Sequence, residues 1–222
     1  MSDIFTIGAK YKKFKVLNVF DVADYHSKAV YLRHEKTGLE VVHLFNDDEE
    51  NLFAFSFRTP NSKSNGAAHI IEHSVLCGSE KFPLKDPFVN LSNQSVKTYL
   101  NAMTYPDKTV YPASSIAKED YLNLMNVYGD AVFFPKLQRE IFMQEAHRLE
   151  VDENENVSVQ GVVYNEMKGN YSSFDSVAND AVTLSLLKNS VYQKDSGGDP
   201  LEIPSITYDE FKAFHKKWYR AD

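Results

Sequence analysis

The sequence has only one cysteine, Cys77, in 222 residues, and it has no long hydrophobic or basic run. A single cysteine excludes an internal disulfide and suits a reducing compartment. The hydrophobic runs fall well short of the roughly 20 residues of a membrane-spanning helix, so we expect no membrane segment. The net charge of -7 and the lack of a basic cluster argue against nucleic acid as a partner. The N-terminal segment resembles neither a secretory signal nor a transit peptide, which predicts a cytoplasmic protein.

The residues that are present form an ordinary globular composition, with 43% hydrophobic and 25% charged residues. Alternating apolar residues predict strands at 14–20, 29–33, 39–45 and 52–58. Helical spacing predicts helices at 67–76, 121–132, 161–172, 176–188 and 208–219, with a short helix after Pro87. Turn residues predict hairpins that join 100–105 to 109–114 and 147–151 to 157–160. Because strands and helices mix without strict alternation, we expect an α+β fold with a mixed, mostly antiparallel sheet and helices packed on it.

One five-residue motif carries the clearest chemistry, and it reads His69-Ile70-Ile71-Glu72-His73. On a helix, capped by Ser64 or Asn65, the two histidines lie one turn apart on the same face. Both imidazoles can then reach one zinc ion at about 2.0–2.1 Å. Glu72 lies beside His73 and can accept a proton from a water molecule without binding the metal. This HxxEH order is the inverzincin signature, and two partly exposed histidines on an ordinary helix are the alternative.

A catalytic zinc site usually has three protein ligands and one open position, so a third ligand must come from elsewhere in the chain. The other acids and histidines are all candidates. Glu166 stands out because it lies between apolar Val163 and Met167 at the start of a predicted helix. A surface glutamate on an amphipathic helix is the alternative. The glycines at 196–199 lack the lysine of a phosphate-binding loop, so we do not expect nucleotide binding.

Several longer motifs occur in order along nearly the whole chain. They are GAAHIIEHSVLCGSEKFPLKDPF, LNAMTYPDKTVYPASS, GVVYNEMKG, SGGDP and FHKKWY. Together they resemble the pitrilysin-type metallopeptidases, and more narrowly the branch of presequence proteases and falcilysin-like enzymes. The resemblance implies that residues 1–222 are the zinc-binding N-terminal peptidase domain of a larger clamshell enzyme. It also implies one zinc ion per chain, with His69, His73 and Glu166 as ligands and Glu72 as the general base.

The resemblance further implies how a substrate is held. The segment Asn101, Ala102, Met103 and Thr104 is similar to the edge strand that pairs with the backbone of a peptide substrate. An interior strand is the alternative. The second half of such enzymes supplies an arginine and a tyrosine that have no match here, so the missing C-terminal half of the same polypeptide is an expected partner.

The sequence therefore predicts a zinc metalloendopeptidase that hydrolyses short unstructured peptides, and it predicts that residues 1–222 alone are nearly inactive. One alternative is a catalytically silent pitrilysin-like subunit that binds or acts as a scaffold. The intact His69, Glu72, His73 and Glu166 argue against it. Another alternative is a zinc hydrolase that acts on a small molecule, which the substrate-strand segment disfavours.

Overall fold

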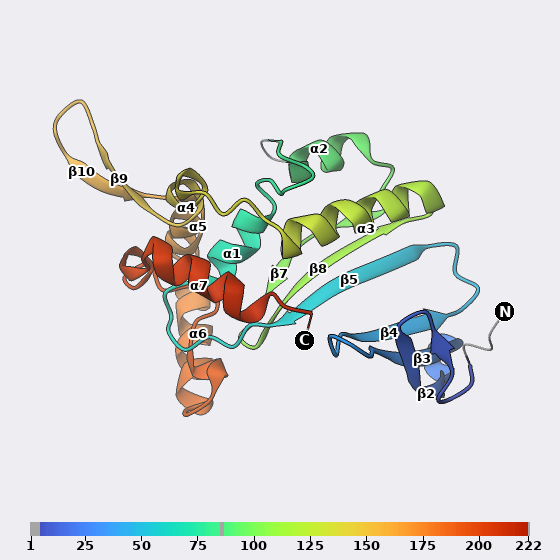
Figure 1. Ribbon diagram of the computed structural model, residues 1–222. Coiled ribbons are helices and arrows are strands. Elements are labelled where there is room, and N and C mark those ends of the chain that lie inside the picture. The colour runs from blue at the N-terminus through green and yellow to red at the C-terminus, as the bar shows by residue number, and fades with distance from the viewer. Residues whose placement is uncertain (1–4, 85–86, 222) are drawn as a thin grey trace. The chain divides into compact units, whose positions relative to one another are not determined.

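The chain divides into two compact units, which are described separately. A computed structural model describes residues 5–84 and 87–221 (Figure 1). One unit comprises Met1–Glu49 with Arg220–Asp222, and the other comprises Glu50–Tyr219. Within the described ranges, no helix combines the length and the apolar character that crossing a membrane requires.

The first unit is a four-stranded antiparallel meander in the order β1-β2-β3-β4. Its elements are β1 (Lys10–Tyr11), β2 (Phe14–Val22), the 3₁₀ turn η1 (Ala23–Tyr25), β3 (Ser27–His34) and β4 (Glu40–Phe45). Its small core contains Val16, Val30 and Leu32, which are all buried. The three longer strands confirm the predicted ones, each with ends within about two residues, and β1 was not predicted.

The second unit mixes strands and helices. Its elements are β5 (Asn51–Arg58), α1 (Ala67–Val75), α2 (Pro87–Gln94), β6 (Tyr99–Leu100), β7 (Met103–Thr104), β8 (Lys108–Ser115), α3 (Lys118–Phe133), α4 (Arg139–Glu145), β9 (Arg148–Val151), β10 (Val157–Gln160), α5 (Val162–Asn170), α6 (Phe174–Leu186), the 3₁₀ turns η2 (Val191–Gln193) and η3 (Ile203–Ser205), and α7 (Tyr208–Trp218). All strand pairs among the described residues are antiparallel, and the predicted α+β class is confirmed.

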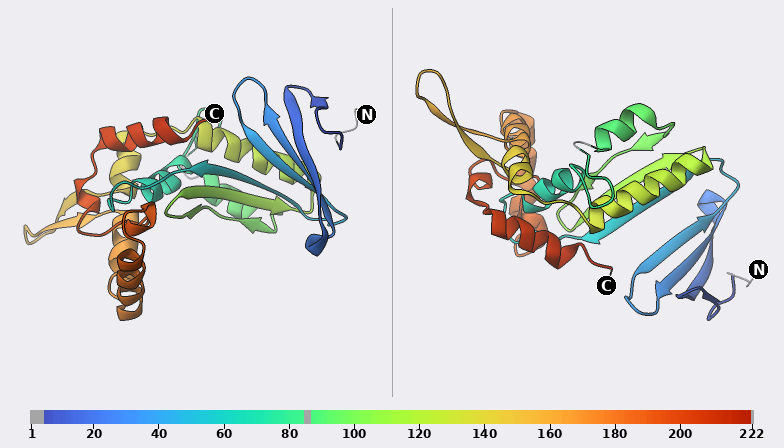
Figure 2. Two further views of the ribbon diagram at one scale, coloured as in Figure 1. Left: turned by 90° about the horizontal axis from the view of Figure 1, so that it is seen from below. Right: turned by 45° about the horizontal axis from the view of Figure 1, so that its top comes forward.

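The sheet of this unit has the order β5-β8-β6, and β7 pairs with the same side of β8 as β6. Helix α3 runs along β5 and β8, as both views in Figure 2 show. Its buried Leu124 and Tyr128 pack into the same core as Phe53 of β5 and Tyr111 of β8. This core also contains Ile70 and other apolar residues of α1, so the sheet fixes the position of the helix that carries the HxxEH motif.

The strand predicted at 100–105 is interrupted at Asn101–Ala102, and a proline explains the interruption. The register of β6 and β7 against β8 continues across the gap and places Asn101 opposite Pro112. Asn101 donates its N–H to the Pro112 carbonyl at 3.2 Å, but proline has no N–H to donate in return. The hydroxyl of Tyr128 donates to the Asn101 carbonyl instead, at 3.3 Å.

Two further sequence expectations need correction. The cap of α1 is Gly66, with φ of 70° and no side-chain hydrogen bond, and neither Ser64 nor Asn65 fills this role. A left-handed backbone conformation favours glycine, so the turn and not a side chain starts the helix. Helix α4 was not predicted, because its seven residues are too few to show a clear helical period.

Candidate metal centre

Helix α1 carries the motif on a largely buried surface. Ile70 and Ile71 are fully buried, as expected for side chains that anchor the helix in the core. His69 and Glu72 are each only 8% exposed, and the His73 side chain is 25% exposed. The imidazole rings of His69 and His73 lie 4.8 Å apart between centroids. One turn of helix thus places both rings together, with His73 the more exposed of the two.

Helix α5 brings Glu166 to these rings. The helix follows Gly161, where an added Cβ would lie 2.1 Å from the carbonyl oxygen of Ala146. Only glycine permits this close approach, which places the start of α5 against the residue that follows α4. The Glu166 side chain is 48% exposed, so its position does not arise from burial in the core.

The two histidines and Glu166 converge through one atom each. The Oε2 atom of Glu166 lies 3.7 Å from Nε2 of His69 and 3.7 Å from Nε2 of His73. The possible ligand atoms of the three residues lie within 4.8 Å of one another, and no other described group of three or more His, Cys, Asp or Glu residues meets this condition. Ligands of one tetrahedral zinc at about 2.0–2.1 Å are roughly 3.3–3.5 Å apart. The three side chains therefore fit one zinc ion, while their role as ligands stays a prediction.

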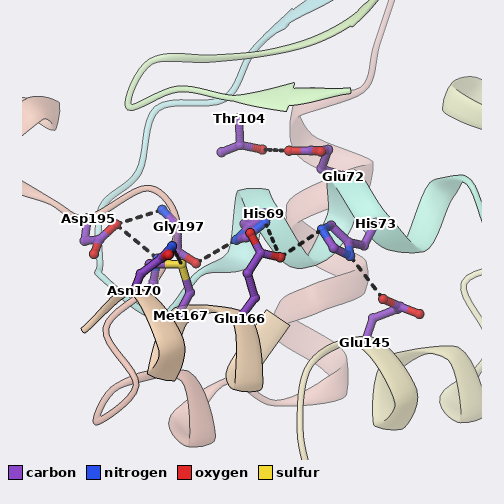
Figure 3. A network of polar contacts seen from close by, with 11 residues as sticks. His69, Glu72, His73, Thr104, Glu145, Glu166, Met167, Asn170, Asp195 and Gly197 are labelled. Atoms are coloured by element: carbon purple, nitrogen blue, oxygen red, sulfur yellow. Dashed lines mark hydrogen bonds and ion pairs between the residues drawn. The ribbon is translucent and has the colours of Figure 1, made fainter. Parts of the chain in front are cut away.

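Both histidines are oriented by acceptors at their other ring nitrogen. Nδ1 of His69 donates to the carbonyl of Gly197 at 3.0 Å, and Nδ1 of His73 donates to the Glu145 carboxylate at 3.2 Å. A carbonyl or a carboxylate can only accept, so each Nδ1 carries the proton and each Nε2 offers its lone pair to a metal. Such partners are typical of metal-binding histidines (Figure 3).

The charges around His73 reinforce this orientation. Burial alone lowers the pKa of His73, but its hydrogen bond to Glu145 and the negative charges of Glu72, Glu145 and Glu166 outweigh burial and raise the pKa. For the Glu145 carboxyl, burial acts to raise the pKa. Hydrogen bonds from His73 and Gln144 outweigh burial and hold the pKa of Glu145 below its usual value. Glu145 is therefore ionised and is a strong acceptor for the imidazole N–H.

Glu72 points away from Glu166 and toward the sheet. Its Oε2 accepts a hydrogen bond from the hydroxyl of Thr104 in β7 at 2.6 Å (Figure 3). This contact fixes one carboxylate oxygen, and the other accepts no hydrogen bond from the described residues. A carboxylate held beside a metal centre, without being one of its ligands, can act as a general base.

The predicted substrate segment lies at one of the two edges of the sheet, opposite the edge formed by β5. Among the described residues, β6 and β7 pair only with β8. Asn101 and Tyr105 donate their N–H groups to β8, so in an antiparallel ladder Ala102 directs its N–H and C=O away from β8. A pocket of about 290 Å³ adjoins this edge, and its lining includes Ala102, Glu72, His73 and Phe88. An edge strand, the predicted general base Glu72 and a candidate metal centre therefore meet in one place.

Sequence reasoning missed three parts of this arrangement. Glu145 lies 72 residues from His73, and no spacing signal connects the two. Gly197 acts through its carbonyl, which no side-chain motif can reveal. The contact of the Thr104 side chain with Glu72 was not predicted, and a role of the Thr104 backbone in substrate binding stays a prediction.

Comparisons with known proteins identify relatives of this chain. The sequence model of the family described as insulinase (peptidase family M16) matches residues 58–192. The chain is 47% identical over 212 residues to protein HypA of Clostridium perfringens, covering 94% of this chain and 22% of the relative. It is 48% identical over 201 residues to presequence protease 1, chloroplastic/mitochondrial, of Arabidopsis thaliana, covering 89% of this chain and 19% of the relative.

The fold also matches a solved structure. The crystal structure of pitrilysin superposes with a TM-score of 0.70 over 95% of this chain and 22% of that chain, at 20% sequence identity. At that identity the match concerns the fold alone. The chain spans about one fifth of the length of the curated relatives it matches.

Proposed function

The chain belongs to the insulinase family of peptidases, family M16, and on this basis we propose that it contributes the metal centre of a zinc-dependent endopeptidase. The family membership and the presequence protease relatives confirm the resemblance expected from the sequence motifs. The observation that carries the proposal is the convergence of His69, His73 and Glu166, with Glu72 beside them.

In this proposal Nε2 of His69, Nε2 of His73 and the Glu166 carboxylate would hold the zinc ion. When bound, zinc supplies a Lewis acid that makes water more acidic and polarises a carbonyl group. The Glu72 carboxylate accepts the proton of the attacking water and later delivers it to the amine that leaves. Thr104 keeps Glu72 in place for both transfers through the 2.6 Å hydrogen bond.

We propose that the substrate is a short unstructured peptide that binds as an added strand. The outward N–H and C=O of Ala102 would pair with its backbone, whatever the side chains of the peptide. The adjoining pocket, partly lined by Phe88, would accept an apolar side chain of the peptide. The relatives extend far beyond the matched stretch, and we propose that such further chain closes over the peptide and is needed for full activity.

Two alternative functions fit the site less well than a peptidase. A silent scaffold subunit would not need the oriented set of His69, His73, Glu166 and Glu72. A hydrolase for small molecules would not need the open sheet edge, which favours a peptide substrate. A cytoplasmic location stays a prediction, because relatives include proteins named for mitochondria and chloroplasts.

The experiment separates the base from the ligands. We expect the Glu72→Gln variant of the full-length protein to retain zinc and to lose about 10²–10⁴-fold in peptide turnover, because water is no longer deprotonated. We expect His69→Ala to lose tight zinc binding. The control is Glu140→Gln, an exposed residue of α4, which should change neither property. Full turnover by Glu72→Gln, or full zinc retention by His69→Ala, would refute the proposal.

A further inference from the structure

The loop at 195–199 contains most of the SGGDP motif, for which the proposed chemistry has no direct use. We propose that Asp195 is a positioning residue for the metal centre, whose carboxylate fixes the Gly197–Gly198 peptide unit and thereby the ring of His69. This inference rests on the proposed zinc centre. Asp195 itself contacts neither the nitrogen and oxygen atoms that would bind zinc nor the strand edge that would bind substrate.

The key observation is that one peptide unit is held at both ends. Its carbonyl, from Gly197, accepts the hydrogen bond from Nδ1 of His69 at 3.0 Å. Its N–H, from Gly198, donates to Oδ1 of Asp195 at 3.2 Å, and the N–H of Gly197 donates to the same oxygen at 2.8 Å. Because a peptide unit is planar, fixing its N–H also fixes the direction of its carbonyl. Figure 3 shows Asp195, Gly197 and His69 in this sequence of contacts.

This peptide unit needs such a restraint. It is flanked by two glycines, which can adopt positive and negative φ and so allow the unit to rotate. Gly198 has φ of 106°, and a Cβ there would lie 2.8 Å from the Cα of Gly66. Close packing against the start of α1 therefore requires glycine, and glycine brings mobility that a hydrogen-bonding carboxylate can remove.

Asp195 is itself tied to both ligand-bearing helices. Its Oδ2 accepts a hydrogen bond at 2.7 Å from the hydroxyl of Tyr171, the C-cap residue that follows α5. Its N–H donates to the hydroxyl of Ser64, just before α1, at 3.2 Å. The loop thus contacts the helix of His69 and the helix of Glu166, so Asp195 can hold these ligands in register with each other.

The arrangement also has an electronic consequence. In many metal sites a carboxylate accepts directly from the histidine, which fixes the ring and makes it a better ligand. Here a peptide unit is inserted between the carboxylate and the ring. A negative charge at the N–H end polarises the peptide and strengthens its carbonyl as an acceptor. Asp195 would thus orient the ring of His69 and make it a better metal ligand through the peptide unit. Glu145 does the same for His73 through a direct hydrogen bond.

The test measures zinc affinity by competition with a chromophoric chelator. Loss of an outer hydrogen-bond partner typically weakens metal binding about 10–100-fold, and since Asp195 acts through a peptide we expect about tenfold for Asp195→Ala. Asp195→Asn retains an oxygen acceptor for the two glycine N–H groups, so it should recover most of this loss. Tyr171→Phe removes one hydrogen bond from Asp195 and should also weaken zinc binding, by a smaller factor.

The matched control is Asp152→Ala. Asp152 caps the turn between β9 and β10, where its Oδ1 accepts from the N–H groups of Asn154 and Asn156 at 2.8 Å each. It therefore resembles Asp195 in its local bonding but has no contact with the metal centre. We expect Asp152→Ala to leave the zinc dissociation constant unchanged, which separates a positioning role from general stabilisation of a loop.

A second measurement does not require metal. Nitrogen-15 NMR of the histidine rings in metal-free protein reports which nitrogen carries the proton, and the His69 signals are assigned by their absence in His69→Gln. We expect wild-type His69 to carry the proton on Nδ1 and Asp195→Ala to shift His69 toward a mixture of tautomers. If Asp195→Ala does not fold, Asp195→Asn and Tyr171→Phe decide by the same two measurements.

The outcomes distinguish this inference from the proposed function. A wild-type protein that binds no zinc would refute the zinc centre, while the ring nitrogens would still report whether Asp195 controls His69. If wild-type protein binds zinc but folded Asp195→Ala shows wild-type zinc affinity and wild-type His69 nitrogen shifts, the positioning role is refuted and the zinc centre stands.

Discussion

Replacing Glu145 by alanine tests whether the orientation of His73 matters for the metal centre. Glu145 is 5% exposed and accepts hydrogen bonds from Nδ1 of His73 at 3.2 Å and from Nε2 of Gln144 at 2.8 Å. Alanine leaves the imidazole N–H without its acceptor and lets the ring rotate. We expect zinc affinity to fall by about 10–100-fold, which corresponds to about 1.4–2.7 kcal/mol.

The same replacement also affects stability, so a control must match its burial. Asp130 is 4% exposed, and its carboxylate accepts from the N–H of Lys81 at 2.8 Å, in a region outside the metal centre. Both variants should lose about 1 kcal/mol or more of unfolding free energy, because each removes the acceptor of a partly buried donor. Urea unfolding measures this loss, and chelator competition measures zinc affinity. A folded Glu145→Ala variant whose zinc dissociation constant equals that of Asp130→Ala would refute the reasoning.

Three further outcomes can be measured. Removing zinc with a chelator should lower the melting temperature, since a ligand at 100 times its Kd stabilises by about 2.7 kcal/mol; an unchanged calorimetric transition would contradict this. Ile70→Ala in the core of α1 should cost about 2–5 kcal/mol in urea unfolding, and a loss below 1 kcal/mol would show that the site collapses around the smaller side chain. The Lys63 ammonium, followed by the backbone N–H of Thr207, lowers the pKa of Glu210 from 4.5 to about 2. The stability contributed by Glu210 is therefore present above pH 4.5 and is lost as the pH falls to about 2. Glu210→Gln should lose less stability over this pH range than the wild type. Equal acid sensitivity of the two proteins would contradict the assignment.

How far the sequence predicts this site depends on the distance between its parts along the chain. His69 and His73 are four residues apart, so helix geometry alone places their rings together. Glu166 is 93 residues beyond His73, and only the resemblance to a family singled it out with a defined role. The contact of His69 with Gly197 spans 128 residues and uses a backbone atom, so neither spacing nor residue type predicts it.

Prediction of the fold from the sequence depends in the same way on distance along the chain. Strands such as β3 and β5 follow from local alternation of side chains, and their predicted ends lie close to the observed ones. The interruption at Asn101–Ala102 arises from Pro112, which becomes a neighbour only once β8 folds back along this segment. Local pattern therefore predicts elements, while the details that shape the site come from residues that meet only in the folded chain.

The short length of β6 and β7 has a consequence for the tendency of the protein to aggregate. A long, flat free edge is a template on which copies of a chain can stack into a fibril. Here each of the two edge strands has only two residues, and the ladder is broken between them. A strand added at this edge can therefore form only a few consecutive hydrogen bonds, which disfavours sustained stacking on this side of the sheet. On this side of the sheet, Pro112 therefore limits the length of unbroken strand with which a second copy of the chain could pair.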